Sequence, residues 1–215
     1  ERFGCAVLDG VGSTEMLHIY VSNREGKVRY GTSGQPVPGY DIRLVDERGD
    51  DIPDGEVGEM IVRGPSMAEA YWNRREKTLS TFVGSWMWTG DKYIHLGDSF
   101  YQYAGRTDDM FKSGGNWVSP FDVESALIEH EKVLEAGVIP HADDTGNLKP
   151  KAYVVLTDGA LPSDALADEL KAHVKARIEV WKYPRWIEFT ESLPKTATGK
   201  IQRFVLRAMD EGSTH

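Results

Sequence analysis

The pattern of apolar residues changes near the middle of the chain, and this change limits the possible folds more than any other feature. Up to residue 105, short β-type runs such as residues 42–45 and 57–62 alternate with turn formers. Such runs predict strands. From residue 109 onward, helix-type and strand-type segments alternate. The sequence therefore predicts an α+β protein, with a small barrel or distorted sheet first and an α+β module second.

Individual elements can be placed along the chain. Strands are expected at residues 5–8, 42–45, 57–62, 101–103, 133–140, 152–156 and 186–189. A helix is expected over 119–128, because Pro120 is favoured in a first turn. A second helix is expected over 163–176, with Ser163 as its N-cap. Residues 201–209 are an apolar run that is compatible with a helix.

Composition excludes some function classes. No run approaches the ~20 apolar residues that a membrane-spanning helix needs, so we expect no membrane partner. The net charge of −9 argues against general nucleic-acid binding, although local Lys, Arg and backbone N–H groups can still hold phosphate. A single cysteine excludes an intrachain disulfide and is typical of a reducing, cytoplasmic setting. The abrupt start, without Met, suggests a piece of a longer protein.

The segment 194–203, PKTATGKIQR, contains the residue most strongly expected to be functional, Lys200. Small residues and Gly199 precede it, and a loop of this kind bends easily and presents a long side chain at its end. Lysine is a flexible point cation that suits phosphate or carboxylate oxygens. The structural alternative is a solvated lysine on a surface turn.

The junction at residues 105–118 combines charges, glycines and turn formers. Two interpretations are open. It is either a polar linker that carries a β-hairpin with a glycine turn, or a hinge in which a few residues absorb the backbone change of a moving domain.

Together, five segments resemble the adenylate-forming enzymes, which include acyl- and aryl-CoA synthetases, adenylation domains and luciferases. The segments are residues 12–15 (GSTE), 55–73 (from GEVGE to YWN), 88–91 (WTGD), 105–124 (GRTDD to VSPFDVE) and 194–200 (PKTATGK). Residues 9–19 and 117–121 look most like the corresponding segments of benzoate–CoA ligases.

The resemblance implies a domain organisation. Residues 1–105 would be the C-terminal part of a large domain, including its β-subdomain, 106–109 a hinge, and 110–215 a small mobile domain. Family members carry a lysine-ended phosphate loop upstream of the first motif, and this sequence has none. The implied partner is therefore the missing N-terminal portion of the same protein; a homodimer is one option for assembly.

The resemblance also implies an ATP-dependent aryl (benzoate-type) acid–CoA ligase that uses ATP, Mg²⁺ and CoA. An aromatic carboxylate would attack the α-phosphate of ATP, and the CoA thiol would then displace AMP. Such chemistry requires positioning and charge neutralisation. The residues implied in ATP or AMP binding are Gly12, Ser13, Thr14, Asp91, Arg106 and Lys200.

The implied roles in the nucleotide site follow the chemistry of each side chain. The Thr14 hydroxyl would bind the α-phosphate, and Glu15 would help to hold Mg²⁺. Asp91 would accept both ribose hydroxyls, and Arg106 would donate to ribose or phosphate. The structural alternatives are a capping Thr, a solvated Glu, a turn Asp and an interdomain salt bridge.

Lys200 is implied in the first step only. It would contact the substrate carboxylate and the oxygen that bridges to the α-phosphate, where charge develops in the transition state. Rotation about Asp108 would then remove Lys200 and bring Ser113, Gly114 and Gly115 to the CoA path, which glycines let the backbone approach. The alternative for the glycines is an ordinary tight turn.

The acyl pocket is only partly present in this sequence. Val11 stands where many members carry an aromatic residue that stacks on adenine, and benzoate-type ligases also have an aliphatic residue there. By the same resemblance His18 and Ile19 would line the aryl pocket, although a histidine in an apolar run can equally be a core residue. Two other functions stay open: an adenylation domain that loads a carrier protein, and a non-catalytic binding module.

Overall fold

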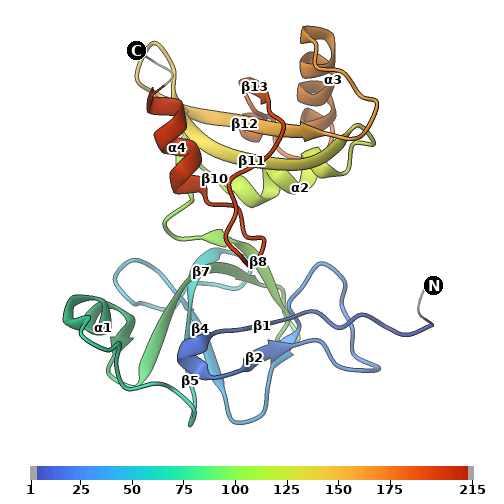
Figure 1. Ribbon diagram of the computed structural model, residues 1–215. Coiled ribbons are helices and arrows are strands. Elements are labelled where there is room, and N and C mark those ends of the chain that lie inside the picture. The colour runs from blue at the N-terminus through green and yellow to red at the C-terminus, as the bar shows by residue number, and fades with distance from the viewer. Residues whose placement is uncertain (1–3, 213–215) are drawn as a thin grey trace. The chain divides into compact units, whose positions relative to one another are not determined.

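The computed structural model describes residues 4–212, and the chain divides into two compact units, Glu1–Thr107 and Asp108–His215. Strands dominate the first unit, and strands and helices alternate in the second (Figure 1). The predicted α+β class is therefore confirmed. The strands predicted from residue 42 onward and the helices predicted at 119–128 and 163–176 are all present, with boundaries shifted by a few residues.

The first unit contains two sheets whose neighbouring strands are all antiparallel. One sheet has the order β1-β2-β3, and the other has the order β4-β5-β7-β6 with β8 paired to β7. The strands are β1 (Gly10–Gly12), β2 (Ile19–Ser22), β3 (Gln35–Pro36), β4 (Asp41–Val45), β5 (Val57–Arg63), β6 (Phe82–Val83), β7 (Trp86–His95) and β8 (Tyr101–Arg106), and the helices are the 3₁₀ turn η1 (Thr14–Met16) and α1 (Arg75–Thr81). Met16, Tyr20, Met60 and Met87 contribute to one core shared by both sheets. This arrangement corresponds to the distorted-sheet alternative rather than to one barrel.

The strand expected at residues 5–8 is wrong, and β7 is missing from the sequence-based assignment. No described strand pairs with residues 5–8, and Val7 and Leu8 are 75% and 47% exposed. Without a neighbouring ladder, an apolar run has nothing that fixes it as a strand. β7 escapes detection because it passes through Gly90, a turn former whose φ is 72°.

The second unit is an antiparallel pair, β11 and β12, extended by β13 parallel to β12, together with the hairpin β9–β10. Its elements are β9 (Phe111–Ser113), β10 (Asn116–Val118), α2 (Pro120–Ile128), β11 (Val133–Ala142), β12 (Leu148–Leu156), α3 (Asp164–Lys175), the 3₁₀ turn η2 (Val180–Lys182), β13 (Trp186–Phe189) and α4 (Arg203–Gly212). As predicted, Ser163 caps α3, its Oγ accepting from the N–H of Leu166 at 3.2 Å.

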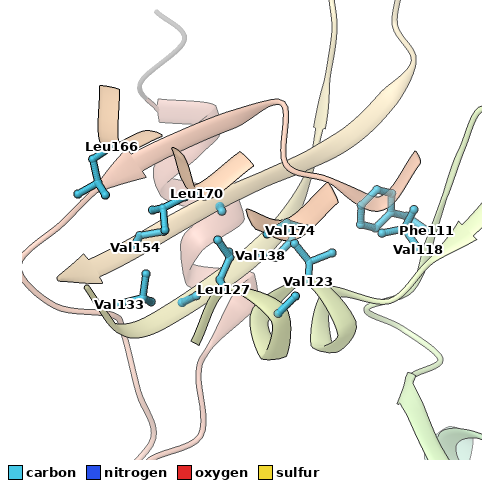
Figure 2. Close-up of a cluster of buried hydrophobic side chains, with 13 residues drawn as sticks. Phe111, Val118, Val123, Leu127, Val133, Val138, Val154, Leu166, Leu170 and Val174 are labelled. Atoms are coloured by element: carbon cyan, nitrogen blue, oxygen red, sulfur yellow. The ribbon is translucent and has the colours of Figure 1, made fainter. Parts of the chain in front are cut away.

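Alternation along the strands gives this sheet two buried faces. Val138 and Val154 pack with α2 and α3 in one cluster of apolar side chains, which Figure 2 shows. Their chain neighbours Ile139 and Tyr153 lie in a second cluster with Leu206 of α4. Helices thus cover both faces of the sheet. The helix α4 begins three residues after Lys200 and packs on the second of these faces.

Candidate active site

A close approach of β1 and β2 positions the segment GSTE. A Cβ atom at Gly12 would lie 2.6 Å from the carbonyl oxygen of His18, so only glycine permits this spacing. The turn η1 starts directly afterwards and places Thr14 at the surface. Within residues 4–212, the Thr14 hydroxyl makes no hydrogen bond with the chain, and η1 has no side-chain cap. The capping role considered for Thr14 is therefore absent.

Two residues in the C-terminal part of segment 55–73 hold Glu15 in place. The Tyr71 hydroxyl donates to Glu15 Oε1 at 2.5 Å, and the Glu15 carbonyl accepts from the N–H of Ala68 at 2.7 Å. Burial opposes the charge of Glu15, but hydrogen bonds from Tyr71, from its own backbone and from Ser13 outweigh it and lower the pKa of this carboxyl. Glu15 is therefore an ionised, oriented carboxylate rather than a freely solvated one.

A protein-only metal centre is absent from the part of the chain that the structure describes, because no group of three or more His, Cys, Asp or Glu side chains could hold an ion there. Mg²⁺ usually keeps several waters and binds through one or two carboxylates plus substrate phosphates. The single ionised carboxylate of Glu15 fits that mode of binding.

Asp91 and Arg106 are direct partners in the β7–β8 register. Arg106 Nη1 donates to Asp91 Oδ1 at 3.1 Å, and the side chains are 45% and 18% exposed, respectively. Gly90 lies beneath the guanidinium, since a Cβ there would be 2.9 Å from Arg106 Nη2. The ion pair therefore lies inside the first unit.

The charges of this set act on one buried phenol. Burial raises the pKa of Tyr20 most, the carboxylates of Asp91 and Glu15 raise it further, and Arg106 lowers it.

His18 and Ile19 are exposed, so His18 is not the core histidine considered as the alternative. Both of its ring nitrogens have partners: Nδ1 lies 2.8 Å from the carbonyl oxygen of Ile19, and Nε2 lies 2.8 Å from the Tyr40 hydroxyl. The Tyr40 hydroxyl also lies 2.6 Å from Ser66 Oγ. These contacts fix the ring orientation of His18.

In the second unit, Lys200 lies at the end of a closed turn. The N–H of Thr196 donates to the Lys200 carbonyl at 2.9 Å, and the N–H of Lys200 donates to Thr196 Oγ1 at 3.1 Å. Gly199 supplies the left-handed backbone, with φ of 82°. Lys200 is exposed, whereas the neighbouring Lys195 pairs with Glu135. The turn thus exposes Lys200 to solvent, whereas the ion pair with Glu135 fixes the side chain of Lys195.

Ser113, Gly114 and Gly115 form the tip of the β9–β10 hairpin, as the linker interpretation expected. Gly114 and Gly115 have φ of 59° and 86°, and a Cβ at either would meet no atom within 4 Å. Their backbone conformation, not crowding within the second unit, requires glycine here. Ser113 is buried, and its Oγ accepts from Lys149 Nζ at 3.3 Å.

The residues on either side of Asp108 are anchored to different units. Thr107 donates through its N–H to the Gly90 carbonyl at 2.8 Å and through Oγ1 to Glu59 at 3.1 Å. Asp109 accepts from Arg203 Nη1 at 2.8 Å. Asp108 itself is exposed and lies where the units divide. Its role as a hinge stays a prediction.

The predicted site residues thus fall into two sets. Gly12, Ser13, Thr14, Glu15, His18, Ile19, Asp91 and Arg106 belong to the first unit, and Asp108, Ser113, Gly114, Gly115 and Lys200 belong to the second. Sequence analysis missed the contacts that orient them, notably those of Tyr71, Tyr40 and Arg203. Tyr71 stands inside a recognised motif, and Arg203 ends the segment 194–203 that contains Lys200, which was the available signal; Tyr40 carried none.

Two family models match the chain. Residues 1–72 match the family described as AMP-binding enzyme, and residues 122–200 match the AMP-binding enzyme C-terminal domain. The chain belongs to this family of adenylate-forming enzymes and matches the C-terminal part of its members.

Individual relatives indicate which adenylate-forming enzymes this chain resembles. The chain is 58% identical to a benzoate–CoA ligase of Thauera aromatica over 96% of its length, and 56% identical to a 4-hydroxybenzoate–CoA/benzoate–CoA ligase of Rhodopseudomonas palustris over 99%. It spans 40% of each of these relatives. A benzoate–CoA ligase from Burkholderia xenovorans superposes over 95% of this chain and 41% of its own, with a TM-score of 0.86 and 57% identity. An anthranilate–CoA ligase in complex with anthranoyl-AMP superposes over 96% of this chain and 40% of its own, with a TM-score of 0.91 and 48% identity.

The relatives' names are those of CoA ligases, which join an acid to a thiol. Within residues 4–212, the structure has no helix long and apolar enough to cross a lipid bilayer.

Proposed function

We propose that this chain is the C-terminal part of an ATP-dependent aromatic acid–CoA ligase of the benzoate type, acting in the cytoplasm. The observation that carries the proposal is the presence in the first unit of an oriented Glu15 carboxylate and of the Asp91–Arg106 pair, in a chain more than half identical to benzoate–CoA ligases. Its proposed partners are an aromatic carboxylate, ATP, CoA and the N-terminal part of the same protein.

In the first step, the chain's residues hold the nucleotide and neutralise developing charge. The Thr14 hydroxyl donates to the α-phosphate, Asp91 accepts from the ribose hydroxyls, and Arg106 donates to ribose or phosphate oxygens. Glu15 would help to hold Mg²⁺, which would neutralise phosphate charge when ATP is bound. Lys200 stabilises the charge on the oxygens shared by the carboxylate and the α-phosphate, which is greatest in the transition state.

In the second step, the thiol of CoA attacks the acyl carbonyl and AMP leaves. No cation is needed at the position of Lys200. We propose that the backbone at Asp108 changes conformation, since Thr107 and Asp109 are both held by their own units. The change would withdraw Lys200 and deliver the hairpin tip at residues 113–115 to the CoA path.

The test is aryl-CoA formation by a full-length ligase that contains this chain, given ATP, Mg²⁺, CoA and a panel of benzoates. We expect CoA-dependent product with benzoate or a hydroxybenzoate. The 215-residue chain alone, which lacks a phosphate loop, should release no carboxylate-dependent pyrophosphate. A carrier protein bearing phosphopantetheine should not replace CoA. Turnover with the carrier but not with CoA would favour the carrier-loading alternative, and no adenylation of any acid would favour a binding module.

A further inference from the structure

Arg203 joins three parts of the second unit through one guanidinium group. Its Nε and Nη2 donate to the two carboxylate oxygens of Glu124 in α2, at 3.0 and 2.6 Å. Its Nη1 donates to Asp109 Oδ2 at 2.8 Å. Glu124 Oε1 also accepts from the N–H of Val138 in β11, at 2.8 Å. The planar fork of arginine permits this arrangement, and lysine could not reproduce it.

The network is largely withdrawn from water. The side chains of Glu124, Asp109 and Arg203 are 7%, 15% and 18% exposed. Burying charges costs free energy, and an apolar replacement of similar volume is often as stable. Stability alone therefore gives little reason for such a network at this position. The bidentate Arg203–Glu124 pair does, however, fix where the start of α4 lies relative to α2.

Arg203 stands three residues after Lys200, and the chain between them is rigidly held. The N–H of Gln202 donates to the Pro194 carbonyl at 2.9 Å, and Ile201 pairs with Lys195 across the turn. Ile201 also packs against the cluster that contains Leu206. A shift at the start of α4 would therefore displace the Lys200 turn.

The remainder of α4 is fixed as well. Near its end, Asp210 accepts from Lys151 Nζ at 2.6 Å and from the Tyr153 hydroxyl at 3.0 Å. In its middle, Leu206 is buried against Gly137, where a Cβ would lie 2.8 Å from Leu206 Cδ1. The helix is thus a stiff support. Its first residue, Arg203, makes the shorter of two contacts to Asp109, and Arg207, one turn later, donates to Asp109 Oδ1 at 3.4 Å.

We propose that Arg203 is a positioning residue that fixes Lys200 relative to Asp109, the first anchored residue after Asp108. The inference rests on the proposed function, in which Lys200 acts in adenylation alone. The orientation set at Asp108 would reach Lys200 through Asp109 and the start of α4, chiefly by the contact of Asp109 with Arg203 and less by its longer contact with Arg207, instead of through the whole sheet. Arg203 touches no reacting atom in this account and acts only through Lys200.

The experiment measures both half-reactions in a full-length ligase that contains this chain: adenylate formation, and thioester formation from supplied aryl-adenylate. Arg203→Lys keeps the charge and loses the fork, and it should lower adenylation by about 10²-fold, the order expected for a misplacement of roughly 1 Å. Thioester formation should stay unchanged. Combining it with Lys200→Ala should cause no loss beyond that of Lys200→Ala, because the two residues act as one unit.

Asp109→Asn is the second variant, because it leaves the Arg203–Glu124 pair intact and should fold even if Arg203→Lys does not. It should lower adenylation selectively as well. Arg177→Lys is the matched control: Arg177 pairs with Glu129 at 2.7 Å at the surface, far from Lys200 in sequence, and this variant should behave as the wild type.

The outcomes separate this inference from the proposed function. Selective loss of adenylation in Asp109→Asn supports it, provided that the double variant with Lys200→Ala loses no more than Lys200→Ala alone. Equal loss of both half-reactions with a lowered melting temperature, wild-type adenylation in both Arg203→Lys and Asp109→Asn, or additive losses would overturn it while leaving the proposed function in place. If Lys200→Ala itself retains adenylation, the proposed function and this inference both fail.

Discussion

Asp91 and Arg106 face each other across the paired strands β7 and β8, and Arg106 Nη1 donates to Asp91 Oδ1 at 3.1 Å. Gly90 stands directly before Asp91 with φ of 72°, and its carbonyl accepts the N–H of Thr107 at 2.8 Å. One left-handed glycine therefore sets the backbone from which the proposed ribose acceptor projects, and it also anchors the residue before Asp108.

Gly90→Ala should damage this arrangement in two ways. A left-handed non-glycine residue costs about 1–3 kcal/mol, and the new Cβ would lie 2.9 Å from Arg106 Nη2. Gly146→Ala is the control, since its φ of 79° is similar but no atom lies within 4 Å of its Cβ. In the 215-residue chain, we expect both variants to lower the melting temperature, Gly90→Ala by more than Gly146→Ala. In a full-length ligase, we expect only Gly90→Ala to weaken AMP binding. Equal melting temperatures with unchanged AMP affinity would argue against a role for Gly90 in placing Arg106.

Tyr71→Phe should change how stability depends on pH. Burial raises the pKa of Glu15, but the hydrogen bond from Tyr71 and others outweigh burial, so its pKa in the folded chain lies below the ordinary value of 4.5. A lowered folded pKa adds stability that is present above the ordinary value and is lost as the pH falls through the folded pKa.

The free energy of unfolding lost in Tyr71→Phe should therefore be larger at about pH 7 than at about pH 3, because part of the stability contributed by the charged Glu15 is already lost below the ordinary value. Urea unfolding of the chain at both pH values measures it. Tyr30→Phe, at a residue 84% exposed, is the control and should show no such difference. A loss in Tyr71→Phe that is the same at both pH values would mean that the hydrogen bond does not hold Glu15 ionised.

Much of the fold could be predicted because its elements carry local signals. Pro120 in the first turn of α2 and Ser163 at the cap of α3 mark helix starts that the structure contains. Residues 5–8 and β7 failed for opposite reasons. The apolar run at residues 5–8 has no neighbouring strand and stays irregular. In contrast, β7 pairs with β5 on one side and β8 on the other, and this pairing keeps it a strand across Gly90, a residue type that predicts a turn.

The site was predictable only as a set of motifs. The family resemblance predicts that Glu15 and Lys200 are site residues, but the groups that orient them come from distant parts of the chain. Tyr71 is 56 positions from Glu15, and Arg203 is 94 positions from Asp109. Hydrogen bonds over such separations depend on how strands and helices pack, which periodicity and spacing do not encode.

Asp108→Pro tests the proposed hinge. Proline fixes φ near −65° and removes a backbone donor, so a residue that must adopt two conformations would be held in one. We expect adenylation to survive and thioester formation to fall in a full-length ligase. General destabilisation would instead lower both half-reactions together with the melting temperature. Unimpaired thioester formation in a well-folded variant would exclude Asp108 as the hinge.

The central claim is that Lys200 serves adenylate formation and not thioester formation, and Lys200→Ala in a full-length ligase tests it most directly. Loss of a charge used only in the transition state typically costs about 10²–10³ in rate, or about 3–4 kcal/mol. Lys195→Ala is the matched control, because Lys195 lies in the same turn but pairs with Glu135. The account predicts that Lys200→Ala loses adenylation by this factor and converts supplied aryl-adenylate to aryl-CoA at the wild-type rate. An equal fall in both half-reactions would contradict it.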